Sequence, residues 1–347
     1  MTWVGLLLAD PSPCLRLRVL RELLDRTDDD GEVQELLALR SSDPLLAETV
    51  AAQDEDGSWP ATREPDAPTG DSVYATAVAL LRLGYLGLGP EHDSVRRGAE
   101  YLFSQQQADG AWPLHARRCR RDGGDGYSMM PMQTAIPLHG LAMCGYAPDA
   151  RAEKAYEWLL AQRLPEGAWP TGIAGGDFGY VGGYRRIAHS RWGCRSNTTG
   201  ALNCLALHPQ RRTGDAARRA LDLLLGRETR ETQTLGFEVA RRVGFEPSRG
   251  FITHYARFDL AQMLDLCARV GASPANDERV AALMAFVREQ QGEYGLWEYA
   301  PRPQASRWVT FDVLRSLRRL GGVDGEAWVG LEPRTPYRSY SRERARY

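Results

Sequence analysis

A short phrase recurs along this chain and constrains its fold more than any other feature. Each full copy has a glutamine, then a glycine and, two residues after the glycine, a tryptophan. The full copies end in Trp59, Trp112, Trp169 and Trp297, and a degenerate copy ends in Phe237. These aromatic residues are 53, 57, 68 and 60 residues apart. Repeats of this length each form one supersecondary unit, and neighbouring units bury a continuous core between them.

Two kinds of helix alternate with the phrase. The helices expected before a copy are charged on one face, which is typical of helices with a solvated side. They span 93–107, 152–162, 215–227 and 277–291, with Asp93, Asp149, Asp215 and Asn276 or Asp277 as expected N-caps. The helices expected after a copy are apolar around most of their circumference, so we expect them to be buried. They span 72–83, 132–144, 198–207, 255–270 and 308–320.

The start of the chain supplies one more buried helix. Ser12 followed by Pro13 is typical of a helix start, so 13–24 is expected to be the sixth inner helix. Six inner helices inside outer ones predict an all-α fold, a closed (α/α)6 toroid that forms one domain over residues 1–325. The Arg-rich segment 326–347 is expected to be an extended tail.

We expect the phrase itself to be structural. Its glycine permits a tight turn and close approach of another backbone. Its tryptophan packs between units and has an N–H that needs a partner. Its glutamine lies at the end of an outer helix, where backbone groups are left open.

The composition excludes some functions. A net charge of −2 gives no electrostatic reason to expect nucleic acid as a partner. The sequence contains no run of 18 apolar residues, which is the length that a transmembrane helix needs. Cys14, Cys144, Cys204 and Cys267 fall within apolar helical runs, which indicates free thiols and a reducing cytoplasm.

The phrase Gln-x-x-x-Gly-x-Trp at this period resembles the QW motif of the terpenoid cyclase and protein prenyltransferase superfamily, which includes squalene–hopene cyclases. The resemblance covers about residues 10–322. It implies an α/α toroid that acts on or binds an isoprenoid or other apolar substrate in its central cavity. An enzyme of this kind would be a terpene cyclase-like isomerase or lyase, or a prenyltransferase-like enzyme.

Two catalytic signatures of that superfamily are missing. The acidic Asp-x-Asp-Asp motif of class II cyclases does not occur. Asp265 and Cys267 have the spacing of the prenyltransferase zinc pair, but no histidine follows them. The resemblance therefore implies neither site, and no cofactor is expected.

Polar and aromatic residues gather where the expected inner helices begin, and we expect those ends to converge on a ligand site. Asp259 or Asp312 is the expected acid or base, together with His254; the alternative is that each aspartate is a helix cap or an arginine partner. The expected substrate-binding residues are Tyr74, Arg191, Trp192, Arg195, Asn197, Tyr255, Arg257, Arg307 and Trp308. The arginines would suit an anionic head group and the aromatic faces a carbocation.

Two loops add further possibilities. His115, Cys119, His189 and Cys194 lie in them, and two His with two Cys would suit zinc. The loops span 114–130 and 171–196, and long loops of this kind are often lids over an opening.

Two other functions remain open. One is a non-catalytic toroid that binds a lipid or a partner protein, which a filled ring with an exposed patch would favour. The other is a carbohydrate-active toroid enzyme that uses the two carboxylates, which a shallow acidic groove would favour. A deep apolar cavity would favour the cyclase-like enzyme.

Overall fold

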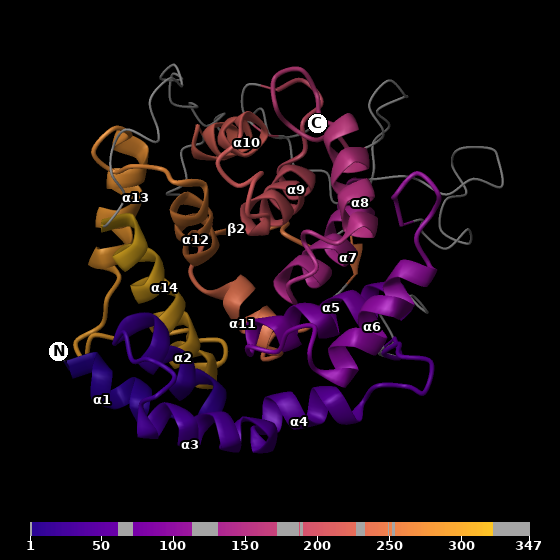
Figure 1. The fold of residues 1–347 in the computed structure, drawn as a ribbon. Helices are drawn as coiled ribbons and strands as arrows, with labels where there is room; N and C mark the ends of the chain where they lie inside the picture. Colours follow the sequence, from indigo (N-terminus) through magenta and orange to yellow (C-terminus); the bar gives the residue numbers. More distant parts are fainter. Residues whose placement is uncertain are drawn as a thin grey trace.

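The computed structural model describes residues 2–61, 72–112, 131–171, 187, 190–226, 233–248, 250–251 and 254–321. Within these ranges the chain is mainly helical and circles once around a ring (Figure 1). The inner helices are α2 (Pro13–Leu23), α5 (Ser72–Tyr85), α7 (Pro131–Met143), α9 (Arg195–Leu207), α12 (Leu260–Val270) and α14 (Ser306–Gly321). The outer helices are α1 (Thr2–Leu8), α3 (Gly31–Leu39), α4 (Pro44–Ala51), α6 (Asp93–Ser104), α8 (Ala150–Ala161), α10 (Asp215–Leu225) and α13 (Glu278–Glu289).

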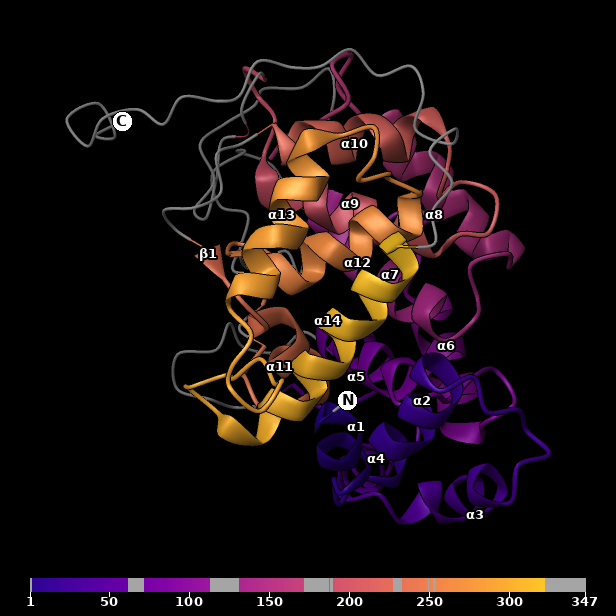
Figure 2. The same cartoon turned by 90° about the vertical axis from the view of Figure 1, so that its left-hand side faces the viewer.

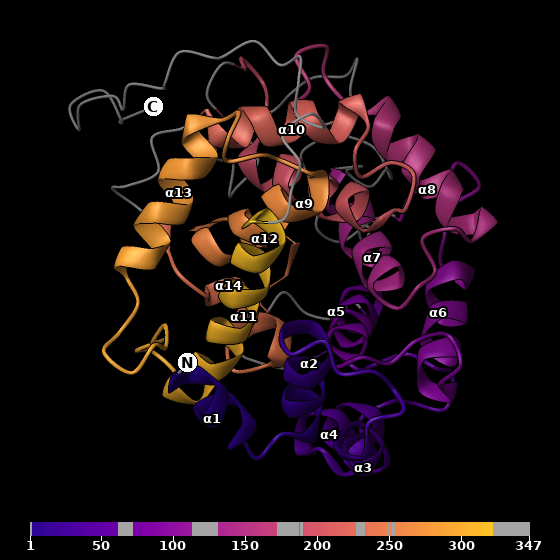
Figure 3. The same ribbon diagram turned by 60° about the vertical axis from the view of Figure 1, so that its left-hand side comes forward.

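The ring closes where the last inner helix meets the first. In Figure 3 the outer helices α6, α8, α10 and α13 surround α7, α9, α12 and α14, and α14 packs against α2. Short 3-10 helices η1 (Arg40–Ser42) and η4 (Pro303–Ala305) precede α4 and α14. The expected all-α toroid is confirmed. Its limits at 325 and 326 remain a prediction, because 322–347 lie outside the described residues.

Most of the expected helices form where periodicity placed them. Ser12 is the N-cap of α2, and its hydroxyl accepts a hydrogen bond from the Leu15 amide at 3.2 Å. Asp149 and Asp277 cap α8 and α13 as expected. The other two expected caps are wrong: His92 and Gly214 are the N-caps of α6 and α10, so Asp93 and Asp215 lie in the first turn instead.

The inner helix expected from residue 255 begins five residues later. Tyr255 has a left-handed backbone with φ 51°, which a helix does not accommodate. Residues Phe258–Asp259 form β2, which pairs in parallel with β1 (Gln233–Thr234). Asp259 then caps α12, so the helix can begin only at Leu260.

The repeated phrase joins an outer helix to the next inner helix at each full copy. The indole N–H of every phrase tryptophan donates to a carbonyl ten residues earlier in the outer helix, at 2.6–2.7 Å. The backbone amide of the same tryptophan donates to a threonine hydroxyl near the start of the next inner helix. The four threonines are Thr76, Thr134, Thr198 and Thr310, at 3.0, 3.2, 3.0 and 2.9 Å. The phrase is therefore structural, as expected, and the threonine is a part of it that sequence reasoning missed.

The glutamine and glycine of the phrase fix the next outer helix. Gln53 donates to the carbonyl of Gly57 and to that of Ser94 at the start of α6, both at 2.9 Å. It thus reaches forward to the next unit and does not bond the end of its own helix. Gly57 has φ 88°, and a Cβ there would lie 2.6 Å from the Arg97 carbonyl oxygen, so only glycine fits.

A short helix that periodicity did not predict lies in the middle of the ring. This helix, α11 (Phe237–Val243), packs against α5, α12 and α14 (Figure 2). Gly236 and Gly244 bound it with φ 88° and 96°. It carries three buried charged residues, Glu238, Arg241 and Arg242. A helix with buried charged residues therefore lies between α5, α12 and α14.

None of the helices in the described part of the chain is long and apolar enough to cross a membrane.

Candidate functional site

Charged residues of α11 and α14 form a buried ion-pair network. Glu238 pairs with Arg241 one helical turn away. Arg242 Nη1 lies 3.4 Å from Asp312 Oδ2, and Arg315 Nη2 lies 2.8 Å from Asp312 Oδ1. Asp312, an expected acid or base, is therefore the partner of two guanidinium groups, which is the alternative that the sequence left open.

Arg315 extends this network to two more inner helices. Its guanidinium lies 3.2 Å from Asp265 of α12 and 3.6 Å from Glu22 of α2. Burial by itself would raise the pKa of Glu22, but the charges of Arg18 and Arg315 bring it down to about 2. Burial would also raise the pKa of Asp265, but the charges of Arg269 and Arg315 hold it well below its usual range. The network therefore keeps Glu22 and Asp265 ionised where α2, α12 and α14 meet.

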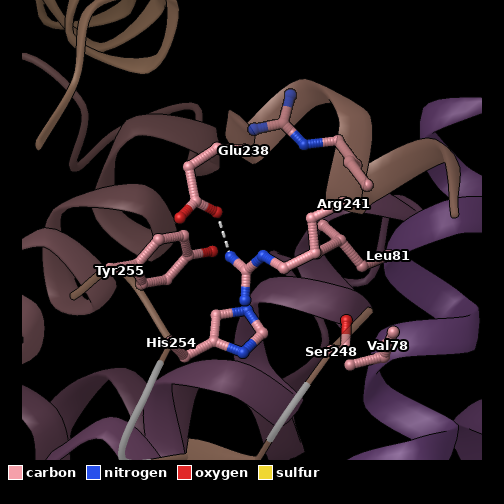
Figure 4. A pocket seen from close by; sticks show the side chains of 8 residues that line it. Val78, Leu81, Glu238, Arg241, Ser248, His254 and Tyr255 are labelled. Atoms are coloured by element: carbon pink, nitrogen blue, oxygen red, sulfur yellow. Dashed lines mark hydrogen bonds and ion pairs between the residues drawn. The ribbon is translucent and has the colours of Figure 1, made fainter. Parts of the chain in front are cut away.

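A narrow pocket of about 10 Å³ lies beside α11 (Figure 4). Its lining residues are Val78, Leu81, Glu238, Arg241, Arg242, Ser248, His254 and Tyr255. A volume of this size holds about one water molecule. We name it the α11 pocket.

His254 is anchored on one side of this pocket. Its Nδ1 lies 2.9 Å from the Tyr74 hydroxyl, and its ring is packed edge-on against Tyr255. The Tyr255 hydroxyl lies 2.7 Å from Nδ1 of His139. Burial and the nearby Arg241 charge lower the pKa of His254 well below its usual value, so the ring is neutral at pH 7. The structure thus brings together three of the expected site residues, His254, Tyr74 and Tyr255.

Asp259 has hydrogen-bond donors on both carboxylate oxygens. Oδ1 accepts from the Gln262 amide at 3.1 Å, and Oδ2 accepts from the Glu238 amide at 3.3 Å and from the Thr234 hydroxyl at 3.2 Å. It therefore joins β1, α11 and α12, which is the cap role that the sequence left open beside catalysis. Burial and the Glu238 carboxylate nevertheless raise the pKa of Asp259 to about 6.

Replacing Asp259 by asparagine is expected to flatten the pH dependence of stability between about pH 4 and about pH 6. An unfolded aspartate has a pKa of about 3.9, so in that window the folded wild type binds more protons than the unfolded chain. Stability of the wild type should therefore fall as pH rises, by about 3 kcal/mol for a shift of this size. Urea unfolding at several pH values measures the difference between wild type and Asp259→Asn.

Asp149→Asn is the matched control, because Asp149 is also an N-cap. Its hydrogen bond with Arg151 lowers the pKa of Asp149, so that carboxylate stabilises the fold above its unfolded pKa and less at lower pH. Its contribution therefore has the opposite sign. Equal slopes for Asp259→Asn and wild type would show that Asp259 titrates normally.

The other expected binding residues do not meet at one site. Asn197 accepts a hydrogen bond from the Met132 amide at 2.7 Å and so fixes the start of α7. Arg195 donates to the Ala256 carbonyl at 2.6 Å. Arg191 and Trp192 are exposed and contact each other, and exposed Arg257 lies over the ring of Phe237.

Arg307 and Trp308 border a larger pocket, of about 440 Å³. It lies between the starts of α2, α4 and α14 and the chain that follows α11. Its lining residues are Asp10, Pro11, Ser12, Asp43, Pro44, Leu45, Phe245, Leu296, Pro303, Gln304, Ser306, Arg307 and Trp308. We name it the ring-closure pocket, since α2 and α14 close the ring. Pockets of 300–1,000 Å³ are typical of small-molecule sites.

Sequence reasoning missed the charged residues of α11. Glu238, Arg241 and Arg242 lie three and four residues apart, which places them on one helical face. The flanking Gly236 and Gly244 are a further signal of a short, bounded helix. The degenerate phrase copy at 233–237 obscured this pattern.

The zinc and lid expectations fall mostly outside the described residues. His115, Cys119 and His189 are not described, and neither is most of 114–130 and 171–196. Cys194 is described and buried. Within the described ranges no three His, Cys, Asp or Glu side chains are placed to hold a metal ion. The zinc alternative is therefore untested, as is the expectation that no cofactor is bound.

Comparison with known proteins identifies relatives of part of the chain. Residues 33–181, which contain the first three phrase tryptophans, match the family model of the squalene-hopene cyclase C-terminal domain. A lanosterol synthase of Candida albicans is 31% identical over 99 residues, which are 28% of this chain and 14% of that protein. A squalene–hopene cyclase of Zymomonas mobilis is 29% identical over 143 residues, which are 40% of this chain and 20% of that protein.

The chain thus spans at most about a fifth of the length of these curated relatives. Among solved structures, the type II terpene cyclase MstE from Scytonema aligns with 79% of this chain and 94% of its own, at 15% identity and a TM-score of 0.34. Residues 33–181 of this chain are thus similar to the C-terminal domain of squalene-hopene cyclases, and parts of the chain are similar to the two curated terpenoid cyclases.

Proposed function

We propose that this protein binds an isoprenoid or other apolar molecule in the ring-closure pocket and acts on it as a terpenoid cyclase-like enzyme. The observation that carries the proposal is the pocket itself, whose volume of about 440 Å³ is that of a small-molecule site. The names of the curated relatives, a lanosterol synthase and a squalene–hopene cyclase, support an isoprenoid as the substrate class.

The walls of the ring-closure pocket suit an apolar ligand. Leu45, Phe245 and Leu296 are half-buried, so part of their apolar surface is available to a ligand. Burying that surface against an apolar molecule is favourable. Prolines 11, 44 and 303 also line the pocket, and their fixed φ angles make its loops stiff before a ligand arrives.

The guanidinium group of Arg307 is a polar group in the wall of the ring-closure pocket. Arg307 Nη1 lies 3.3 Å from Asp10 Oδ2, and the Arg307 side chain is 33% exposed. An arginine at this degree of exposure can hydrogen-bond the polar end of a mainly apolar ligand. The sequence-based choice of Arg307 and Trp308 as ligand contacts is therefore part of the proposal.

The charged helix α11 inside the ring favours a second candidate. Because α11 occupies the space between α5, α12 and α14, the toroid could bind its ligand without converting it. A partner protein belongs to this second candidate. The carbohydrate-active alternative has less support, because Asp259 and Asp312 have different partners and are both buried.

Binding of farnesol and squalene, measured by native mass spectrometry and by titration calorimetry, tests the proposal. Leu45→Gln should weaken binding about tenfold or more, since a buried leucine side chain contributes about 1.5–3 kcal/mol. Leu39→Gln is the control, because Leu39 is an exposed leucine outside the pocket. Absence of binding, or equal effects of the two variants, would overturn the proposal. Gas chromatography of the bound compound then separates an enzyme, which releases a changed product, from the binding candidate.

A further inference from the structure

Arg307 is the only positively charged residue among the described residues that line the ring-closure pocket. Its Nη1 donates to Asp10 Oδ2 at 3.3 Å, and no other hydrogen bond joins the guanidinium to a residue in the described ranges. A guanidinium carries five N–H groups, and the Arg307 side chain is 33% exposed. Arg307 therefore has donors left for a ligand, and a ligand beside it has to present an acceptor.

Asp10 offsets the charge of this guanidinium before any ligand arrives. Its Oδ1 accepts from the Ser12 amide at 2.9 Å, and its Oδ2 accepts from Arg307. The residue is 8% exposed, so water screens the pair only weakly. Both oxygens of Asp10 are thus engaged, and the carboxylate is held beside Arg307.

Asp43 adds a second negative charge to the wall of the pocket. It is 0% exposed, and its oxygens accept from the Ser12 hydroxyl, from the Cys14 amide at 3.2 Å and from the Leu45 amide at 3.0 Å. Two aspartates and one arginine line the pocket, which leaves one formal negative charge in excess. An anionic head group would therefore meet net repulsion there.

The helices that begin at the pocket do not reverse this balance. The start of a helix attracts anions through its free amides and its dipole, and α2 and α4 both begin here. Ser12 and Asp43 cap these two helices, and the cap of α4 is itself negatively charged. The amides in the first turns donate to these two caps; they are those of Cys14, Leu15, Leu45 and Leu46.

We propose that Asp10 is a specificity-determining residue of the ring-closure pocket. By pairing with Arg307, it makes the pocket select a neutral isoprenoid that carries an oxygen acceptor, such as an alcohol, over a diphosphate or a carboxylate. The remaining N–H groups of Arg307 bond the oxygen. A hydrocarbon would leave these donors unpaired, and an anion would be repelled. This inference names the head group of the ligand, and so it rests on the proposed function.

The first test compares three ligands that share one chain, by titration calorimetry. Wild type should bind farnesol about tenfold more tightly than farnesene and about tenfold more tightly than farnesyl diphosphate. Asp10→Asn should raise the ratio of diphosphate affinity to farnesol affinity about tenfold, because it frees Arg307. Asp25→Asn is the matched control and should keep the wild-type ratio, since it removes a carboxylate that pairs with Arg318 outside the pocket.

Three outcomes of this comparison would overturn the proposal. They are equal binding of farnesol and its diphosphate to wild type, equal binding of farnesol and farnesene, and equal ratios for Asp10→Asn and Asp25→Asn. Circular dichroism shows whether each variant is folded. If Asp10→Asn does not fold, the preference of wild type among the three ligands decides.

The second test uses inorganic pyrophosphate and needs no isoprenoid. Asp10→Asn should bind pyrophosphate about tenfold more tightly than wild type, and adding Arg307→Gln to that variant should remove the gain. Equal pyrophosphate affinity of Asp10→Asn and wild type would show that Asp10 does not control the charge of the pocket. If none of the three isoprenoids binds wild type, the proposed function fails, and the pyrophosphate titration still decides the role of Asp10.

Discussion

Replacing Arg315 by methionine is expected to lower the free energy of unfolding by about 3–5 kcal/mol, the usual cost of removing one partner from a buried ion pair. Arg315 is 2% exposed and faces carboxylates from three inner helices. Methionine has a similar length and no charge. It would leave Glu22, Asp265 and Asp312 close together with less positive charge among them, so the loss is electrostatic more than steric.

Arg318→Met is the matched control for this prediction. Arg318 lies on the same helix and pairs with Asp25, but its side chain is 44% exposed. Exposed pairs contribute about 0–1 kcal/mol, so the control should change stability little. Urea unfolding followed by circular dichroism measures both variants. Similar losses for Arg315→Met and Arg318→Met would show that the network does not hold α2, α12 and α14 together.

Replacing Trp169 by alanine is expected to cost about 3–5 kcal/mol, as for other large-to-small changes in a core. Trp169 is 0% exposed, and its indole N–H donates to the Leu159 carbonyl at 2.6 Å. The change leaves a cavity between α8 and α9 and removes one hydrogen bond to the Leu159 carbonyl, which keeps the bond from the Gln162 amide. Natural domains have about 5–15 kcal/mol of stability in total, so the soluble yield should also fall.

Trp192→Ala controls for the loss of an indole as such. Trp192 is 40% exposed, and surface changes of this kind usually stay within about 0.5 kcal/mol. The two variants should therefore differ by several kcal/mol in urea unfolding. A small loss for Trp169→Ala would mean that the phrase tryptophans are not what joins neighbouring units.

Local pattern was sufficient to predict the ring because its signals repeat within each unit. The spacing of apolar residues shows which face of a helix is buried, and the phrase marks where one helix gives way to the next. For this reason α8, α10 and α13, and the Ser12 cap of α2, form close to where the sequence placed them. The expected cap at Asp93 was wrong by one residue, because periodicity alone does not fix a helix boundary to within one or two positions.

The candidate site was predicted only in part. The sequence placed His254, Tyr74 and Tyr255 at one expected site. His254 contacts both tyrosines, and their roles at a site stay a prediction. It also grouped Arg191 and Trp192 with them, but these residues are exposed. Clustering of polar residues near helix starts indicates which end of the ring they occupy, but not whether each side chain turns inward, caps a helix or faces solvent.

The sequence by itself determined the unit of this protein: an outer helix, a Gln-Gly-Trp phrase and an inner helix, repeated around a ring. These features depend on residues a few positions apart, so periodicity and turn chemistry suffice to predict them. Only the tertiary structure decided that α11 packs against α5, α12 and α14, that Asp312 lies between Arg242 and Arg315, and that Asp259 caps α12. The physical reason is distance along the chain: Glu22 and Arg315 are partners from opposite ends of the sequence. A buried charged side chain is stable only beside an opposite charge, and these two side chains come together only when the ring closes.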